Sequence, residues 1–316
     1  MEGLEFLKEY DVLFGLDPSG SFSDIQWKRV LLEVISYAGN VAGETKFAVL
    51  FVLSVSIIGA FMPKWKMSSY LLVGICGVPV LKDFVTLVNV GRTGIAELTG
   101  IMVTAIPALF SLNFSGGTGL FLLVTQILGF LALNVFLPLL LCQTALGISE
   151  SLSDPFQLSG LKQSIRSLFT WGLGIVMLIF SLVSTIGGTV LGANATTVGR
   201  SLRYAGSMIP VVGRYLAESA ELIYASSSAL AGAGGVGVCI AVIGCMVRPF
   251  VRLFIYSLLY KFTAFCIRPF GEKSVVTLLD AVSDGLSGLA GLTILVAAIA
   301  LINVAVIVRI VGMAVG

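Results

Sequence analysis

Four long stretches of this chain carry no charged side chain, and they limit the possible folds more than any other feature. The stretches without Asp, Glu, Lys or Arg are residues 98–149, 167–199, 222–247 and 285–308. A helix needs about 20 apolar residues to cross the hydrocarbon core of a bilayer, so each stretch is long enough to cross at least once. With 57% hydrophobic and 11% charged residues, the composition is far from that of a soluble globular protein. The sequence therefore predicts an integral membrane protein.

The predicted fold is all-α, because a membrane span must satisfy its own backbone hydrogen bonds and the alternating pattern of a transmembrane barrel is absent. We expect a polytopic transmembrane helical bundle of about seven to eight membrane segments. The expected segments, some of them re-entrant or broken by Pro or Gly, are 47–62, 67–81, 98–114, 118–148, 167–192, 227–247, 250–267 and 286–308. As one helix the stretch 98–149 would be about 78 Å long, so it should fold back near Ser115–Thr118.

Two parts of the chain are predicted. Residues 1–44 form an acidic N-terminal segment followed by an amphipathic interfacial helix, expected from about Ser23 to Asn40. Residues 45–316 form the polytopic membrane domain.

Proline motifs indicate a weak internal repeat within the membrane domain. AIPAL at 105–109 recurs as MIPVV at 208–212, which suggests pseudo-repeats of about 47–148 and 167–308. The alternative is chance, because proline between aliphatic residues is frequent in membrane helices. The helix breaks that we expect are at Pro107, Pro210, Gly213 and Pro249.

Arg214 and Glu218 are the first candidates for charges within the membrane. They are four residues apart, so they share one helix face and can pair. One interpretation is an interfacial helix whose charges face water; the other is a charged strip that is buried or lines an aqueous path. We favour the second interpretation for this pair.

The stretch from Arg248 to Phe270 is too charged for an ordinary span and too apolar for a loop. Arg252 and Lys261 are nine residues apart, so they project on opposite sides of a helix. Lys261 either extends toward the membrane surface or meets a neighbouring helix, where Asp280 and Asp284 are the nearest acidic candidates. If Lys261 meets these aspartates, one interpretation is an ion pair that holds the last two helices together. A further interpretation is a role of these residues in translocation.

Several classes of function find no support in the residues. The chain has no histidine, its five cysteines lie in apolar surroundings, and its net charge is only +2. We therefore expect no enzyme activity, no catalytic residue, no metal, no cofactor and no nucleic-acid partner.

Three blocks carry a resemblance to a known family: IPVVGRYLAESAELI at 209–223, FIYSLLYKFTAFCIRPFG at 254–271 and LLDAVSDGL at 278–286. Their order and spacing resemble the stage III sporulation protein AE family, from about Phe22 to Val311. The region 63–100 matches only in hydropathy, and the acidic residues 1–20 do not resemble the leader peptide that is usual in the family.

The resemblance implies a multi-pass protein of the bacterial cell membrane, in the mother-cell membrane around the forespore. It implies a subunit of the channel or feeding-tube complex that sustains the forespore after engulfment. The implied partners are other membrane proteins of the same sporulation operon, including ring-forming subunits and a secretion-type ATPase, and a forespore membrane protein; a homo-oligomer is a further option. The alternative function is a self-sufficient secondary transporter or permease with a binding site at the membrane midplane.

Overall fold

The fold is a bundle of long helices with no strand in the part of the chain that the structure describes. A computed structural model describes residues 27–61, 66–110, 127, 129–152, 159–186 and 233–315. Its elements are α2 (Trp27–Ala60), α3 (Lys66–Phe110), η2 (Ala132–Phe136), α5 (Leu137–Leu152), α6 (Ser159–Ile186), α9 (Ala233–Ile267) and α10 (Lys273–Val315). The all-α prediction is confirmed for these residues.

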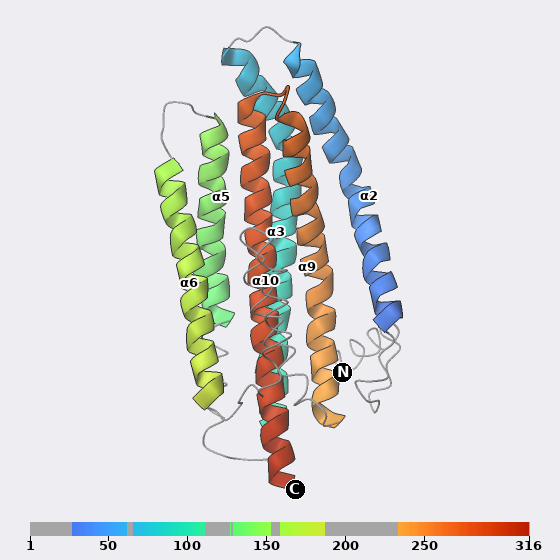
Figure 1. The fold of residues 1–316 in the computed structure, drawn as a ribbon, viewed down its shortest axis with the longest axis vertical. Helices are drawn as coiled ribbons and strands as arrows, with labels where there is room; N and C mark the ends of the chain where they lie inside the picture. Colours follow the sequence, from blue (N-terminus) through green and yellow to red (C-terminus); the bar gives the residue numbers. More distant parts are fainter. Residues whose placement is uncertain are drawn as a thin grey trace.

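The helices form three antiparallel pairs, α2 with α3, α5 with α6, and α9 with α10 (Figure 1). In each pair the first helix ends and the second begins at the same end of the bundle, which we call the hairpin end. The turn from α9 to α10 is tight, because the Gly271 N–H donates to the Ile267 carbonyl over 2.7 Å. This turn places the last residues of α9 opposite the first residues of α10.

Helix α10 is the centre of the bundle, with α3, α5 and α9 packed around it (Figure 1). In its apolar span, Lys273–Ile302, 94% of the most apolar window is buried, whereas the other spans reach 22% to 39%. Lipid is as apolar as leucine, so this burial is stabilised by close van der Waals packing more than by exclusion from water. Small residues allow that packing: Gly285 lies against Thr144 of α5, and Gly288 lies against Leu140.

Five described helices are long and apolar enough to span a membrane by length and composition. They contain the spans Leu32–Ala60, Tyr70–Met102, Gly129–Leu152, Val242–Ile267 and Lys273–Ile302. The predicted seven to eight segments are not reproduced, in part because pairs of expected segments lie on one helix. Segment 67–81 and the described part of segment 98–114, residues 98–110, belong to α3. The described part of segment 227–247, residues 233–247, and segment 250–267 belong to α9. The internal repeat stays a prediction.

Pro249 does not break its helix, so that prediction is wrong. Helix α9 runs from Ala233 to Ile267 with Pro249 inside it. The proline is buried, and Gly94 of α3 makes room for its ring: a Cβ at Gly94 would lie 2.8 Å from the Pro249 Cγ. Proline is tolerated inside membrane helices when neighbours compensate for the lost backbone hydrogen bond. Pro107 likewise lies inside α3, which continues to Phe110.

The N-terminal helix also extends further than expected. Helix α2 is continuous from Trp27 to Ala60, so it joins most of the expected interfacial helix to the first expected span and crosses the predicted boundary at residue 44. The stretch 98–149 does fold back, because α3 ends at Phe110 and Gly129 packs against Thr99 of α3. The expected turn at 115–118 lies outside the described residues.

Candidate functional site: a charged strip across four helices

Lys261 of α9 lies between two carboxylates of α10. Its Nζ is 3.1 Å from Asp280 Oδ1 and 3.0 Å from Asp284 Oδ1. The two aspartates are four residues apart on one face of α10, and the tight turn after α9 sets their height relative to Lys261. Arg268 adds a second cation, because its guanidinium donates to Asp280 over 2.9 Å.

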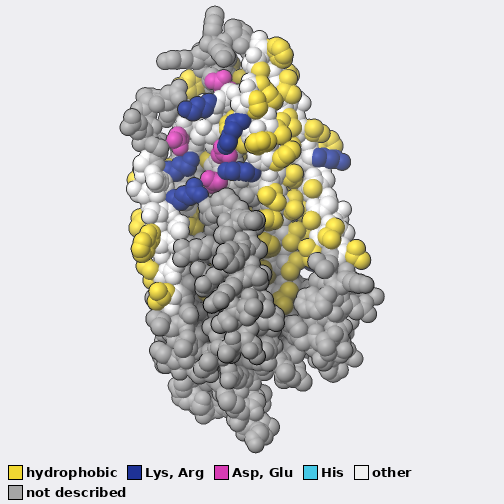
Figure 2. All heavy atoms as spheres, viewed as in Figure 1, with side chains coloured by type: hydrophobic (Ala, Val, Ile, Leu, Met, Phe, Trp, Pro, Cys, Tyr) yellow, Lys and Arg dark blue, Asp and Glu magenta, His cyan; other side chains and the backbone are white. Residues whose placement is uncertain are grey.

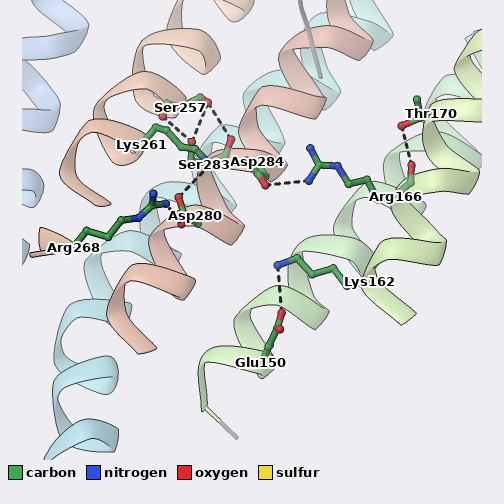
Figure 3. Close-up of polar contacts among 10 residues, drawn as sticks. All are labelled: Glu150, Lys162, Arg166, Thr170, Ser257, Lys261, Arg268, Asp280, Ser283 and Asp284. Carbon is green, nitrogen blue, oxygen red and sulfur yellow. Dashed lines mark hydrogen bonds and ion pairs between the residues drawn. The ribbon is translucent and has the colours of Figure 1, made fainter. Parts of the chain in front are cut away.

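The α5/α6 hairpin contributes charges from the other side. Arg166 of α6 lies 3.5 Å from Asp284, so this carboxylate contacts cations from two different helices. Next to it, Lys162 of α6 pairs with Glu150 of α5 at 3.3 Å. Figure 3 shows these side chains converging from four helices.

We call this set the charged strip: Glu150, Lys162, Arg166, Lys261, Arg268, Asp280 and Asp284. Four cations face three carboxylates, which leaves a formal excess of one positive charge. The side chains are 23% to 59% exposed, so the strip is open to its surroundings. Figure 2 shows charged side chains gathered on one face near the hairpin end.

Further hydrogen bonds join α9 to its neighbours beside the strip, and those between Ser257 and Ser283 are buried and neutral. The Ser257 hydroxyl of α9 and the Ser283 hydroxyl of α10 each donate to the other's backbone carbonyl, over 3.0 and 2.9 Å. These reciprocal bonds fix the register of α9 against α10 (Figure 3). On the α3 side of α9, the Tyr260 hydroxyl donates to Asp83 over 2.7 Å.

Arg252 lies on the opposite side of α9 from Lys261, as the nine-residue spacing predicts. It donates to Glu44 of α2 over 3.0 Å. Helix α9 lies between α2 and α10, so its two cations meet carboxylates on two different neighbours (Figure 1). Arg252 and Lys261 therefore each pair with a carboxylate of a neighbouring helix. The alternative was that the two side chains extend toward the membrane surface.

A small cavity of about 10 Å³ lies beside Asp284 and is lined by Leu140, Gln143, Arg166, Phe169, Asp284 and Gly288. A volume of this size holds about one water molecule. The described residues contain no group of three or more metal-ligating side chains. The arrangement can hold helices together through charge, and its cations neutralise its carboxylates.

The structure brings together three of the predicted site residues, Lys261, Asp280 and Asp284. Whether they line a pore stays a prediction. The other pair, Arg214 and Glu218, lies outside the described residues, as do the expected breaks at Pro210 and Gly213.

Sequence reasoning missed the remaining members of the strip. Arg268 belongs to the second RPF triplet, and Lys162 and Arg166 share one helix face just before a charge-free stretch. These are weak signals, because Arg166 reaches Asp284 only when the α5/α6 hairpin packs against α10 through α5.

Replacing Tyr260 with phenylalanine is expected to destabilise the protein by about 1.5 kcal/mol, the lower end of the range for a hydrogen bond to a charged group, because the change removes the donor to Asp83. The Asp83→Asn variant keeps an acceptor for the hydroxyl and should cost less. Thermal unfolding in detergent measures both effects. Equal stability of Tyr260→Phe and the parent chain would show that Asp83 gains nothing from this contact.

Five helices that are long and apolar enough to span a bilayer indicate an α-helical membrane protein. The family model for stage III sporulation protein AE matches residues 31–311, so the chain belongs to this family. It is also 24% identical over 285 residues to the stage III sporulation protein AE of Bacillus subtilis (strain 168), which covers 83% of this chain and 70% of that protein. No solved structure matches the chain. Membership in this family supports a role in sporulation.

Proposed function

We propose that this chain is a membrane subunit of the channel complex, of the feeding-tube type, between mother cell and forespore. In this role it is needed for development of the forespore after engulfment. The observation that carries the proposal is the family match over residues 31–311. The chain acts in the mother-cell membrane around the forespore, as a multi-pass protein and without enzyme activity of its own.

Exposed apolar surface supports a role in an assembly. Large apolar side chains are exposed on the outside of the bundle, including Phe47 of α2, Phe61 directly after α2 and Trp171 of α6, which are 75%, 87% and 72% exposed. Such surface contacts lipid or other membrane proteins. The proposed partners are the ring-forming subunits and the secretion-type ATPase of the same operon, and a forespore membrane protein.

A self-sufficient transporter is the second candidate, because ionisable residues at membrane depth usually mark ion or substrate paths. In the charged strip, however, the carboxylates contact neighbouring cations, and the cavity beside Asp284 has the size of one water. This arrangement favours a structural role for the strip over substrate binding.

Deletion of the gene should stop sporulation after engulfment has finished. Heat-resistant spore counts and membrane staining of sporulating cells measure the defect and its stage. Reintroducing the gene at a second locus controls for effects on neighbouring genes. Normal spore counts in the clean deletion strain would contradict the proposal.

Purification from sporulating cells in mild detergent then tests the assembly. A tagged chain should carry the ring-forming subunits or the ATPase with it, and the same tag on an unrelated multi-pass protein should not. If the tagged chain is recovered without them and moves a solute across vesicles alone, the transporter is the better description.

A further inference from the structure

The exposed face of α3 changes along the helix. Between residues 71 and 78 its large exposed side chains are Leu71, Ile75 and Val78, which are apolar, as contact with lipid requires. From residue 82 to residue 100 the same face is almost wholly polar or small. Successive residues of a helix are about 100° apart, so the exposed residues of this part cover an arc of about 140°. They are Lys82, Val85, Thr86, Asn89, Arg92, Thr93, Ala96, Glu97 and Gly100.

A close contact with α10 fixes the depth of this polar face. Gly91 of α3 lies against Leu289 of α10, which belongs to the charge-free stretch 285–308. Helices α3 and α10 both run away from the hairpin end, so the part of α3 beyond Gly91 lies beside that stretch (Figure 1). Arg92 and Glu97 are therefore at the depth of the apolar segment with which α10 spans the bilayer.

Arg92 and Glu97 have no opposite charge within the part of the chain that the structure describes. The ion pairs of the described residues join other side chains. Ionisable residues at membrane depth almost always face other protein groups or a water-filled cavity, because hydrocarbon solvates charge poorly. A single copy of the chain exposes both residues, so a second protein surface is needed to cover this face in the bilayer.

The spacing along the face fits a parallel pair of α3 helices. Five of its residues are separated alternately by four and by three positions, which is the repeat that keeps two helices in contact along a seam. Threonine and asparagine hydrogen-bond across such contacts in membranes, and small residues let the two backbones approach closely. We call these residues the polar seam: Lys82, Thr86, Asn89, Thr93 and Ala96.

The two charges flank the polar seam on opposite sides. Arg92 and Glu97 are five residues apart, which in a parallel pair is the spacing between a flanking residue and the one that it meets on the partner helix. Copies of one membrane protein insert in the same orientation, so a twofold axis along the membrane normal makes their α3 helices parallel. Each Arg92 then meets Glu97 of the other copy.

We propose that the polar seam of α3 is the interface between two copies of this chain, closed on both sides by ion pairs between Arg92 and Glu97 of the other copy. This contact is self-complementary, because every cation on one copy meets an anion on the other. It covers the charges that a single chain exposes at membrane depth. It uses no residue of the charged strip, so the strip and the polar seam are separate parts of the molecule.

A cysteine at position 93 tests the contact, because a symmetric parallel pair places this position beside itself. Thr93→Cys is made in the full chain with the native cysteines replaced, reconstituted in phosphatidylcholine–phosphatidylglycerol vesicles and oxidised with copper phenanthroline. We expect a disulfide-linked dimer, since facing seam positions lie within the range of a disulfide. Ile175→Cys is the matched control, because Ile175 is exposed on α6. Cross-linking no greater than that of the control would overturn the proposal.

Charge reversal tests the partner. Energy transfer between donor- and acceptor-labelled chains in the same vesicles measures the dissociation constant. Arg92→Glu alone and Glu97→Arg alone should each raise it about tenfold or more, because like charges then meet twice in the symmetric pair. A mixture of the two variants should pair about as well as the parent chain, because the opposite charges face each other again. Unchanged pairing of the single variants, or no recovery in the mixture, would overturn the proposal.

A neutral variant separates the interface from the fold of one chain. Glu97→Gln should weaken pairing in vesicles, yet leave thermal unfolding unchanged in excess detergent, where the copies are separate. A loss of stability of the separated chain would show that Glu97 acts within its own bundle, which contradicts the proposal. Circular dichroism and gel filtration confirm the fold of each variant. Sporulation is not measured, so the outcome does not depend on the proposed role in the channel complex.

Discussion

Replacing Asp284 with asparagine is expected to lower the free energy of unfolding by about 1.5–3 kcal/mol, the range for hydrogen bonds to charged groups. The carboxylate lies 3.0 Å from Lys261 and 3.5 Å from Arg166, so the neutral amide leaves two cations without their shared anion. Because the side chain is 26% exposed, we expect a loss within this range rather than the larger cost of a fully buried charge.

Thermal unfolding in detergent, followed with a thiol-reactive dye, measures this loss. The exposed Cys142 and the partly exposed Cys266 react before heating, and the buried Cys76 and Cys245 react on unfolding. Glu97→Gln is the matched control, because Glu97 is an exposed carboxylate of α3. Double-mutant cycles should show stronger coupling of Asp284 to Lys261 than to Arg166, in the order of their distances. A loss no greater than that of the control would show that the strip contributes nothing to stability.

Replacing Gly147 with alanine is expected to destabilise the bundle by about 1–3 kcal/mol, the usual cost of an extra methyl in a packed interior. The new Cβ would lie 2.6 Å from the Cβ of Ala281, and neither atom can move by a side-chain rotation. Helix α5 must therefore shift away from α10. The same unfolding assay measures the effect, together with the yield of folded protein after gel filtration.

Two further variants separate packing from helix propensity. Gly174→Ala, in the same hairpin, meets no atom within 4 Å and should be nearly neutral. Ala281→Gly, added to Gly147→Ala, restores the missing space and should recover part of the loss. If Gly147→Ala and Gly174→Ala behave alike, the close approach of α5 to α10 is not a source of stability.

The all-α membrane fold could be predicted because membrane helices are recognisable in the amino-acid sequence as long stretches of apolar residues. The charge-free stretches mark where helices can lie in lipid, and the stretch 98–149 is too long for one span. Helical periodicity also predicted that Lys261 projects on the side of α9 opposite to Arg252, because this depends only on the nine-residue separation of the two positions in the sequence. Its partners Asp280 and Asp284 were within reach because a short turn joins their helix to α9.

Segment boundaries were harder to predict, because they depend on neighbours distant in sequence. Pro249 looked like a break, but Gly94 of α3 accommodates its ring within a continuous helix. The expected segment 67–81 stops just before Lys82 and Asp83, but α3 continues through them, and Asp83 accepts a hydrogen bond from Tyr260. Arg166 was missed for the same reason, since its contact with Asp284 joins residues 118 positions apart.

The burial of α10 has a consequence for the order of assembly. Ribosomes release this helix after all the other described helices, yet α3, α5 and α9 all pack against it. The earlier hairpins therefore enter the membrane without their common neighbour and leave the groove for α10 filled by lipid or by an insertion factor. Chains generally fold from the N-terminus during synthesis, but this bundle can close only when its final helix arrives. A stop codon before Lys273 would then leave α2, α3 and α9 in contact with one another, and the α5/α6 hairpin without the helix that it mainly packs against.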